Sequence, residues 1–133
     1  MTEAAADTAF GAWQDGEVRI IVPAELGHVR LVRLSAAAFA DRLGFNVDDI
    51  EDVRVAVDEL ASCLIERASS GALTVVLSAS AQVFAVAGHV AATQNPVVDE
   101  LTAQILGAVV NSYETGTANG TAWFRAEKSI PDK

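Results

Sequence analysis

The sequence predicts an α+β fold, a two-layer sandwich in which helices cover one face of a mostly antiparallel sheet. Three observations lead to this prediction. Segments with alternating apolar residues occur near the start and in the second half of the chain. Two segments with helical apolar spacing lie between them, and short turn-forming stretches separate the later segments. The chain has 133 residues, 51% of them hydrophobic, which suits one domain with its own core.

The first half of the chain predicts one strand followed by two helices. Residues 17–22, EVRIIV, alternate well enough for a strand. Residues 25–43 have apolar residues at helical spacing, and Gly44 is a natural end for that helix. Asn46 can cap the next helix, which extends to Ala68. The expected core stripe of this second helix is Ile50, Val53, Val57, Leu60, Leu64 and Ala68.

The second half predicts a hairpin, a third helix and two more strands. In order, these segments are strands at 73–78 and 82–87, a loop at 89–96, a helix at 97–110, a weak strand at 112–115 and a strand at 121–126. Asn119 and Gly120 form a turn signal between the last two strands. The third helix is expected to bury Leu101, Ile105, Leu106 and Val109. We therefore expect a domain at 17–127 between a flexible N-terminal tail, 1–16, and a C-terminal tail, 128–133.

Composition and charge exclude several classes of function. The formal net charge of −9 argues against a nucleic-acid surface, because phosphate binding needs clustered Lys and Arg. No apolar run approaches the roughly 20 residues that cross a bilayer, so no membrane contact is expected. The single cysteine, Cys63, cannot form an intramolecular disulfide, and the acidic N-terminus is not a signal peptide. These features favour a cytoplasmic protein, and the histidines lack the spacing of metal ligands, so no metal site is expected.

The segment VRVAVDELASCLIERA places a carboxylate, Glu59, on the half-buried face of a helix. Cys63 stands one turn later, and residues i and i+4 share one helical face. Glu59 is either a general base or a partly solvated carboxylate paired with Arg67, Lys128 or water. Cys63 is either a small buried apolar residue or a reactive thiol.

The pattern AVDELASCLIERA, together with VRLVRLSAAAFADRLGF before it, resembles the anti-sigma factor serine kinases of the RsbW and SpoIIAB type. These belong to the GHKL superfamily with histidine kinases and Hsp90, and the resemblance covers about residues 17–127. It implies that Glu59 occupies the position that activates the serine of a protein substrate. It also implies that Cys63 replaces the Asn that binds Mg²⁺, and that Gly120 and Thr121 match the Gly-Thr that closes the nucleotide site.

Other nucleotide-binding features of that family are missing from this chain. The family has an Asp-x-Gly-x-Gly stretch after the middle strand, where this chain has AGHVAATQN. Only residues 89–96 are available as a shortened lid. Asp99 and Glu100 stand where backbone amides should bind phosphate, and a thiol is a poor ligand for Mg²⁺. We therefore expect no required cofactor, and weak binding of ATP and Mg²⁺ at most.

Arg30 and Arg33 lie away from the apolar stripe of the first helix. The plain interpretation is a solvated helix face, but Arg33 falls where the resemblance implies contact with a sigma factor. The expected function is therefore an anti-sigma factor that blocks access of a sigma factor to RNA polymerase. The resemblance also implies release by an anti-anti-sigma factor of the STAS type, and a homodimer. Two alternatives stay open: an active serine kinase with Glu59 as base, and a non-enzymatic regulatory module that binds another protein.

Overall fold

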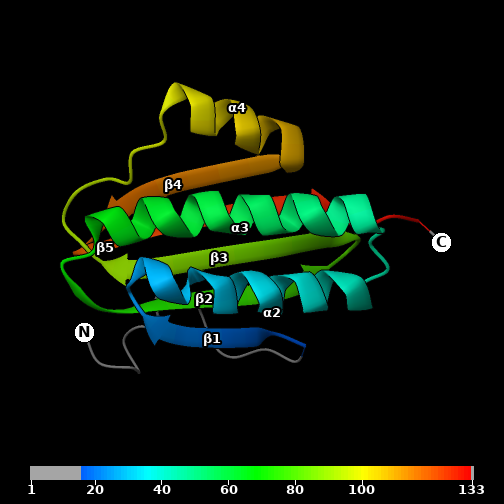
Figure 1. Ribbon diagram of the computed structural model, residues 1–133, viewed down its shortest axis with the longest axis horizontal. Coiled ribbons are helices and arrows are strands. Elements are labelled where there is room, and N and C mark those ends of the chain that lie inside the picture. Colours follow the sequence, from blue (N-terminus) through cyan, green and yellow to red (C-terminus); the bar gives the residue numbers. More distant parts are fainter. Residues whose placement is uncertain (1–15, 133) are drawn as a thin grey trace.

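A computed structural model describes residues 16–132 of the chain (Figure 1). The expected N-terminal tail, 1–16, lies outside the described residues apart from Gly16. The described elements are β1 (Val18–Pro23), the 3-10 turn η1 (Leu26–His28), α2 (Val29–Arg42), α3 (Val47–Arg67), β2 (Ser70–Ser80), β3 (Val83–Ala91), α4 (Glu100–Val109), β4 (Ser112–Ala118) and β5 (Thr121–Ser129).

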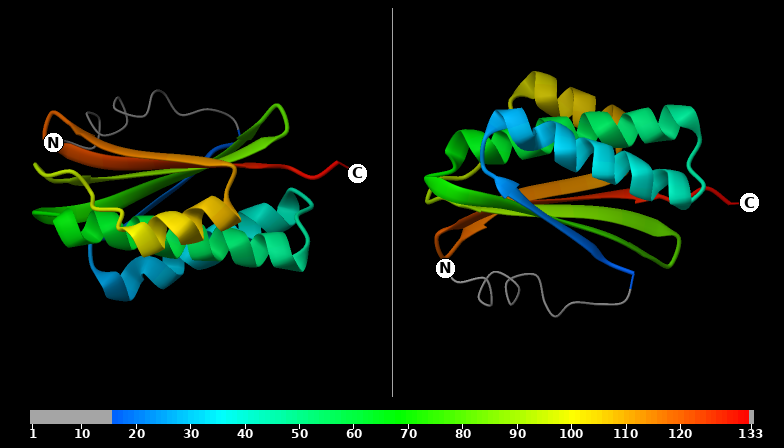
Figure 2. Two further views of the ribbon diagram at one scale, coloured as in Figure 1. Left: turned by 90° about the horizontal axis from the view of Figure 1, so that it is seen from above. Right: turned by 60° about the horizontal axis from the view of Figure 1, so that its bottom comes forward.

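Within the described residues, the strands form one antiparallel sheet in the order β1-β2-β3-β5-β4. Figure 2 shows that α2, α3 and α4 all cover the same face of this sheet. The helix α3 lies in the middle, with α2 along one of its flanks and α4 along the other. The predicted α+β two-layer sandwich is confirmed, and the arrangement is consistent with a GHKL-like fold.

The core lies between the helices and the sheet. The helices bury the stripes that their apolar spacing predicts, with most of the expected residues of α3 fully buried. From the helices, the completely buried side chains include Val32, Ala36, Ala40, Val57, Leu60, Leu64 and Leu106. From the sheet, they include Leu73, Val75, Leu77, Ala122 and Phe124. The ring of Phe124 crosses its strand partner Gly88, where an added Cβ would lie 2.5 Å from the ring.

Two tight turns close the hairpins of the sheet. Asn119 and Gly120 both have positive φ, 53° and 77°, so the turn signal in the sequence is confirmed. The turn between β2 and β3 has the same two-residue form, but it is built from Ala81 and Gln82, with φ of 50° and 68°. The expected hairpin is confirmed, but its turn lies at Ala81 and Gln82 rather than across residues 79–81, because residues with a Cβ rarely adopt such angles and give no local signal for the exact position.

Several expected boundaries were wrong. The loop expected at 89–96 starts later, because β3 continues to Ala91, which pairs with Thr121 of β5. The third helix starts at Glu100 rather than at residue 97, because Asp99 caps it. Leu101 is consequently 66% exposed rather than buried, and Leu106 is the one fully buried side chain of α4. The last strand continues to Ser129, so residues 128 and 129 belong to the sheet and not to a tail.

Candidate functional site

The flank of α3 that faces α4 carries Glu59 and Cys63. Glu59 is half-buried, as expected, and Thr102 of α4 lies against it. The Thr102 hydroxyl donates to Glu59 Oε2 at 3.4 Å, a long and therefore weak hydrogen bond. Arg67 and Lys128, the expected partners of Glu59, bind elsewhere. Arg67 donates to the side-chain oxygen of Gln94, whereas Lys128 donates to the carbonyl of Val109 and lies near Asp49 and Asp52.

Cys63 is buried in an acidic environment. Cys63 is only 8% exposed, and its thiol is free. Burial, followed by the charges of Glu66, Glu59 and Asp99, raises the pKa of Cys63 from 9.0 to about 11. The thiol is therefore protonated at neutral pH. A protonated, soft sulfur does not match the hard oxygen ligands that Mg²⁺ prefers.

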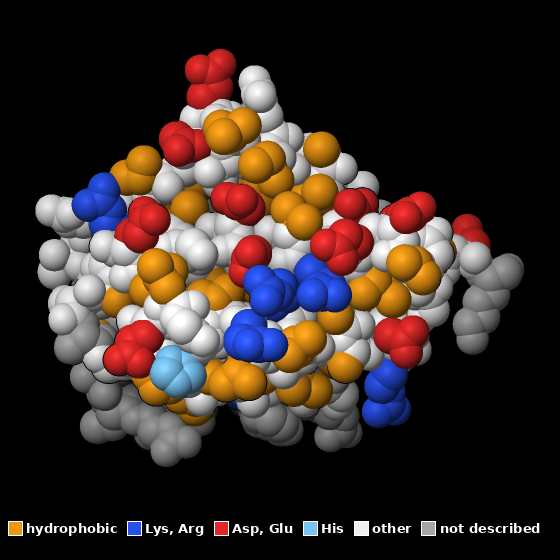
Figure 3. All heavy atoms as spheres, in the orientation of Figure 1, with side chains coloured by type: hydrophobic (Ala, Val, Ile, Leu, Met, Phe, Trp, Pro, Cys, Tyr) orange, Lys and Arg blue, Asp and Glu red, His pale blue; other side chains and the backbone are white. Residues whose placement is uncertain are grey.

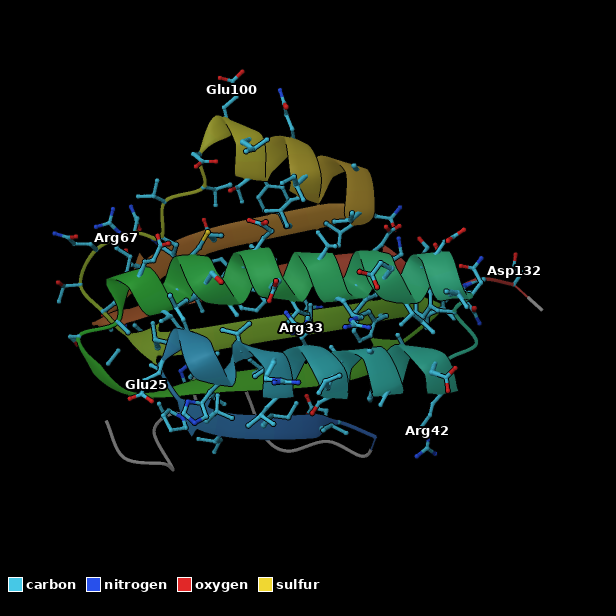
Figure 4. The ribbon with its side chains drawn as sticks, viewed as in Figure 1. Glu25, Arg33, Arg42, Arg67, Glu100 and Asp132 are labelled. Atoms are coloured by element: carbon cyan, nitrogen blue, oxygen red, sulfur yellow. The ribbon has the colours of Figure 1, made fainter. Side chains whose placement is uncertain are left out.

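The N-terminus of α4 is closed by a side chain of the chain itself. Asp99 Oδ1 accepts a hydrogen bond from the backbone N–H of Thr102 at 2.8 Å. This backbone hydrogen bond is the largest cause that lowers the pKa of Asp99. Glu100 adds a second carboxylate in the first turn, and Figure 4 shows its side chain pointing away from the rest of the molecule. A phosphate would meet negative charge at this helix end, where phosphate-binding helices offer free amides.

The short connection between β3 and α4, residues 92–99, is fixed at three points. The N–H of Ala92 donates to the carbonyl of Gly120 at 3.0 Å. The Thr117 hydroxyl donates to Asn95 Oδ1 at 2.6 Å, and Arg67 holds Gln94 at 2.7 Å. The structure thus brings Gly120 next to this connection, and Thr121 is a buried strand residue beside it. A role of Gly120 and Thr121 in nucleotide binding stays a prediction.

The opposite flank of α3 faces α2, and Arg30 and Arg33 of α2 lie on this side. Arg33 lies between the two helices (Figure 4) and its Nη1 donates to Asp58 Oδ1 at 2.9 Å. Arg30, one turn earlier, is exposed. Two residues of α3, Asp58 and Arg54, were not predicted from the sequence as functional residues, and Asp58 is the partner of Arg33. Their i, i+4 spacing places both on one face of α3, but only the packing of α2 shows what that face meets.

Two further features bear on the class of site. Across residues 16–132, no three side chains of His, Cys, Asp or Glu come together as a metal site would require. In the same part of the chain, no helix has both the length and the apolar character needed to cross a bilayer.

No protein-family model matches the chain, but curated proteins with one shared name are similar to part of it. The chain is 33% identical over 63 residues to the serine-protein kinase RsbW of Bacillus cereus (strain B4264), covering 45% of this chain and 39% of that protein. It is 35% identical over 52 residues to the serine-protein kinase RsbW of Bacillus thuringiensis (strain Al Hakam), covering 39% of this chain and 32% of that protein.

The match therefore spans less than half of the length of these relatives. It agrees with the fold, in which a five-stranded antiparallel sheet is covered by helices on one face. The resemblance that the helix sequences predicted is confirmed over the matched part, where this chain is similar to proteins named serine-protein kinase RsbW.

Proposed function

We propose that this protein is an anti-sigma factor that binds a sigma factor and withholds it from RNA polymerase without phosphorylating a partner. The homology to RsbW proteins supports the class of function. The observation that carries the non-catalytic part is the capping of α4 by Asp99, which occupies the amide of Thr102 with a carboxylate of the chain itself. Release would then come from competition by an anti-anti-sigma factor of the STAS type.

The flank of α3 beside α4 supports weak or absent nucleotide binding. Glu59 keeps the position of the family's base, but a metal ligand and a phosphate-binding helix end must act together with it in phosphoryl transfer. Here the metal position holds the protonated thiol of Cys63, and the helix end holds Asp99 and Glu100. These residues do not fit Mg-ATP, so the proposed function does not require nucleotide binding.

The flank of α3 beside α2 supports partner binding. Arg33 keeps part of its side chain, 29%, open to solvent while it pairs with Asp58, and Arg30 is exposed. Arginine donates several hydrogen bonds in a planar arrangement and often dominates interface energies. We therefore place the sigma-factor contact on this flank, and we expect the protein to act as a homodimer.

Two titrations by calorimetry test the proposal. We expect the sigma factor to bind, and Mg-ATP to bind with a dissociation constant above about 10 μM. Tight Mg-dependent binding of ATP would contradict the nucleotide part. Failure of every sigma factor of the source organism to bind would contradict the anti-sigma part and favour a regulatory module for another protein.

An active serine kinase is the second candidate, and the name of the RsbW relatives favours it. Glu59 would be its base, since its carboxylate is half-buried and held only by a weak bond from Thr102. The test is transfer of radiolabel from ATP to an anti-anti-sigma protein, with Glu59→Gln as the control that should abolish it. We expect no transfer, and we expect Cys63→Asn not to create it, because the other missing groups remain missing.

A further inference from the structure

The outward surface of α2 and α3 carries a basic strip that continues from one helix to the other. Arg30 and Arg33 belong to α2, and Arg54 belongs to α3, one turn before Asp58, the partner of Arg33. Figure 3 shows a group of Lys and Arg side chains in the middle of this surface, where α2 and α3 run side by side. We refer to Arg30, Arg33 and Arg54 as the basic strip.

The carboxylates beside the basic strip leave much of its hydrogen-bonding capacity unused. A guanidinium has five N–H donors. Arg33 directs Nη1 to Asp58 at 2.9 Å, and Arg54 lies 3.8 Å from Glu51, beyond hydrogen-bond distance. The side chains of Arg33 and Arg54 are 29% and 38% exposed, so solvent reaches part of each guanidinium group. Their remaining exposed N–H groups, together with those of the exposed Arg30, are therefore available to further carboxylates.

Exposed leucines accompany the basic strip. Leu31 is 49% exposed and Leu34 is 48% exposed, and both lie on α2. Leu34 lies four residues after Arg30 and three residues after Leu31. At this spacing, α2 presents a charged side chain and apolar side chains next to one another. Such a surface matches a partner that offers carboxylates and apolar side chains at the same spacing.

The charge of the whole chain makes the basic strip distinctive. The formal net charge is −9, so an acidic segment is repelled by most of the surface. A positive strip on such a protein fixes where and in which orientation an acidic segment can bind. The complementary ligand is therefore acidic rather than basic.

We propose that the basic strip, with Leu31 and Leu34, binds an acidic amphipathic helix of the partner protein, and that Arg54 of α3 is part of the contact. This proposal rests on the proposed function, because it names the partner segment that binds at the same surface. The proposed function needs only Arg30 and Arg33 of α2, whereas this proposal also requires Arg54 of α3.

Charge reversal tests the proposal on the full chain. Arg54→Glu should weaken binding of the sigma factor by at least about tenfold and reduce its dependence on salt. The matched control is Arg42→Glu, the same change at the far end of α2, roughly 14 Å along the helix from Arg33. Figure 4 shows Arg42 pointing away from the helices. We expect Arg42→Glu to keep the wild-type affinity within about twofold. If Arg54→Glu does not fold, Arg54→Gln removes the charge with less disturbance and serves instead.

A synthetic probe separates this proposal from the proposed function. The probe is a helical peptide with Glu and Leu at three- and four-residue spacing, compared with a peptide that has Lys in place of each Glu. We expect binding of the first peptide only, and its loss in Arg54→Glu. If sigma-factor binding needs Arg33 but not Arg54, the helix-binding proposal is wrong and the proposed function stands. If the acidic peptide binds but no sigma factor does, the peptide site is real and the proposed function is wrong. If neither binds, both proposals are wrong.

Discussion

The two flanks of α3 place carboxylates at adjacent positions in opposite environments. Asp58 faces α2 and pairs with Arg33 at 2.9 Å in a contact that solvent reaches. Glu59, about 100° around the helix, faces α4, and among the described residues its one hydrogen bond comes from the hydroxyl of Thr102 at 3.4 Å. The α2 flank therefore presents open positive charge, whereas the α4 flank is closed and acidic.

Under the proposed function, the α4 flank would have lost nucleotide binding while the α2 flank kept partner binding. The positions that the resemblance assigns to nucleotide binding lie on the α4 flank, which carries Cys63 of α3 beside Asp99 and Thr102. In residues 16–132, no hydrogen bond joins these side chains to Arg33 or Asp58, so we expect changes on one flank to leave the other intact. We infer that binding of a partner needs only the α2 flank.

The largest expected effect concerns how α4 is held against α3. Leu106 is fully buried and anchors α4, whereas Leu101 is 66% exposed. Leu106→Ala should lower the free energy of unfolding by about 2–5 kcal/mol, because it removes buried contacts and leaves a cavity. The matched control, Leu101→Ala, should change it by less than about 0.5 kcal/mol. Urea unfolding of the variants measures both values.

The same variants ask whether the flanks are independent. Where Leu106→Ala remains folded, its affinity for the sigma factor should equal that of the wild type. A loss of affinity in proportion to the loss of stability would contradict the separation of the two flanks.

The next effect follows from the raised pKa of Cys63. Well below pH 9.0 the thiol is protonated in both the folded and the unfolded chain, so it causes no pH dependence there. Between pH 9.0 and about 11 the unfolded chain loses this proton while the folded chain keeps it, so stability falls as pH rises. The full difference corresponds to roughly 3 kcal/mol, at 1.36 kcal/mol for each unit of pKa.

Cys63→Ala isolates this contribution. All other groups titrate in both proteins, so the free energy of unfolding of the wild type should fall more steeply between pH 9 and pH 11 than that of the variant. Parallel curves for the two proteins would mean that the pKa of Cys63 is not raised and that the α4 flank is more open than we describe.

A smaller effect tests the cap of α4. Asp99→Ala should cost about 1 kcal/mol of stability, the usual effect of removing an N-cap side chain. Glu100→Ala is the control, because Glu100 lies in the same turn but does not cap the helix. Equal losses in both variants would show that the contribution is general helix electrostatics and not the hydrogen bond from Asp99 to Thr102.

Much of the fold was predictable because its signals are local. The cap of α3 by Asn46, the turn at Asn119 and Gly120 and the apolar stripe of α3 all follow from short-range spacing. The hairpin between β2 and β3 was also expected, but the exact position of its turn at Ala81 and Gln82 was not. The extension of β3 to Ala91 depends on pairing with β5, about thirty residues later in the chain, which no local pattern contains.

The candidate site was predictable in its residues but not in its contacts. The spacing of Glu59 and Cys63 placed both on one flank of α3, and the structure agrees that Cys63 is buried. The pairing of Arg33 with Asp58 joins two different helices and depends on how they pack. The same holds for Thr102, which meets Glu59 only because α4 lies along that flank.

The smallest expected effect decides whether Arg33 holds the fold together or is available to a partner. Arg33 and Asp58 keep 29% and 47% of their side chains exposed, so their attraction is screened by water. A double-mutant cycle with Arg33→Gln and Asp58→Asn should give a coupling free energy of about 0.2–1 kcal/mol in urea unfolding. Asp58→Asn should bind the sigma factor at least as tightly as the wild type, because it removes a negative charge beside Arg33. Arg33→Glu, in contrast, should abolish binding while the melting temperature changes little. A coupling above about 2 kcal/mol, or unfolding of Arg33→Glu, would make Arg33 a structural residue and move the partner surface elsewhere.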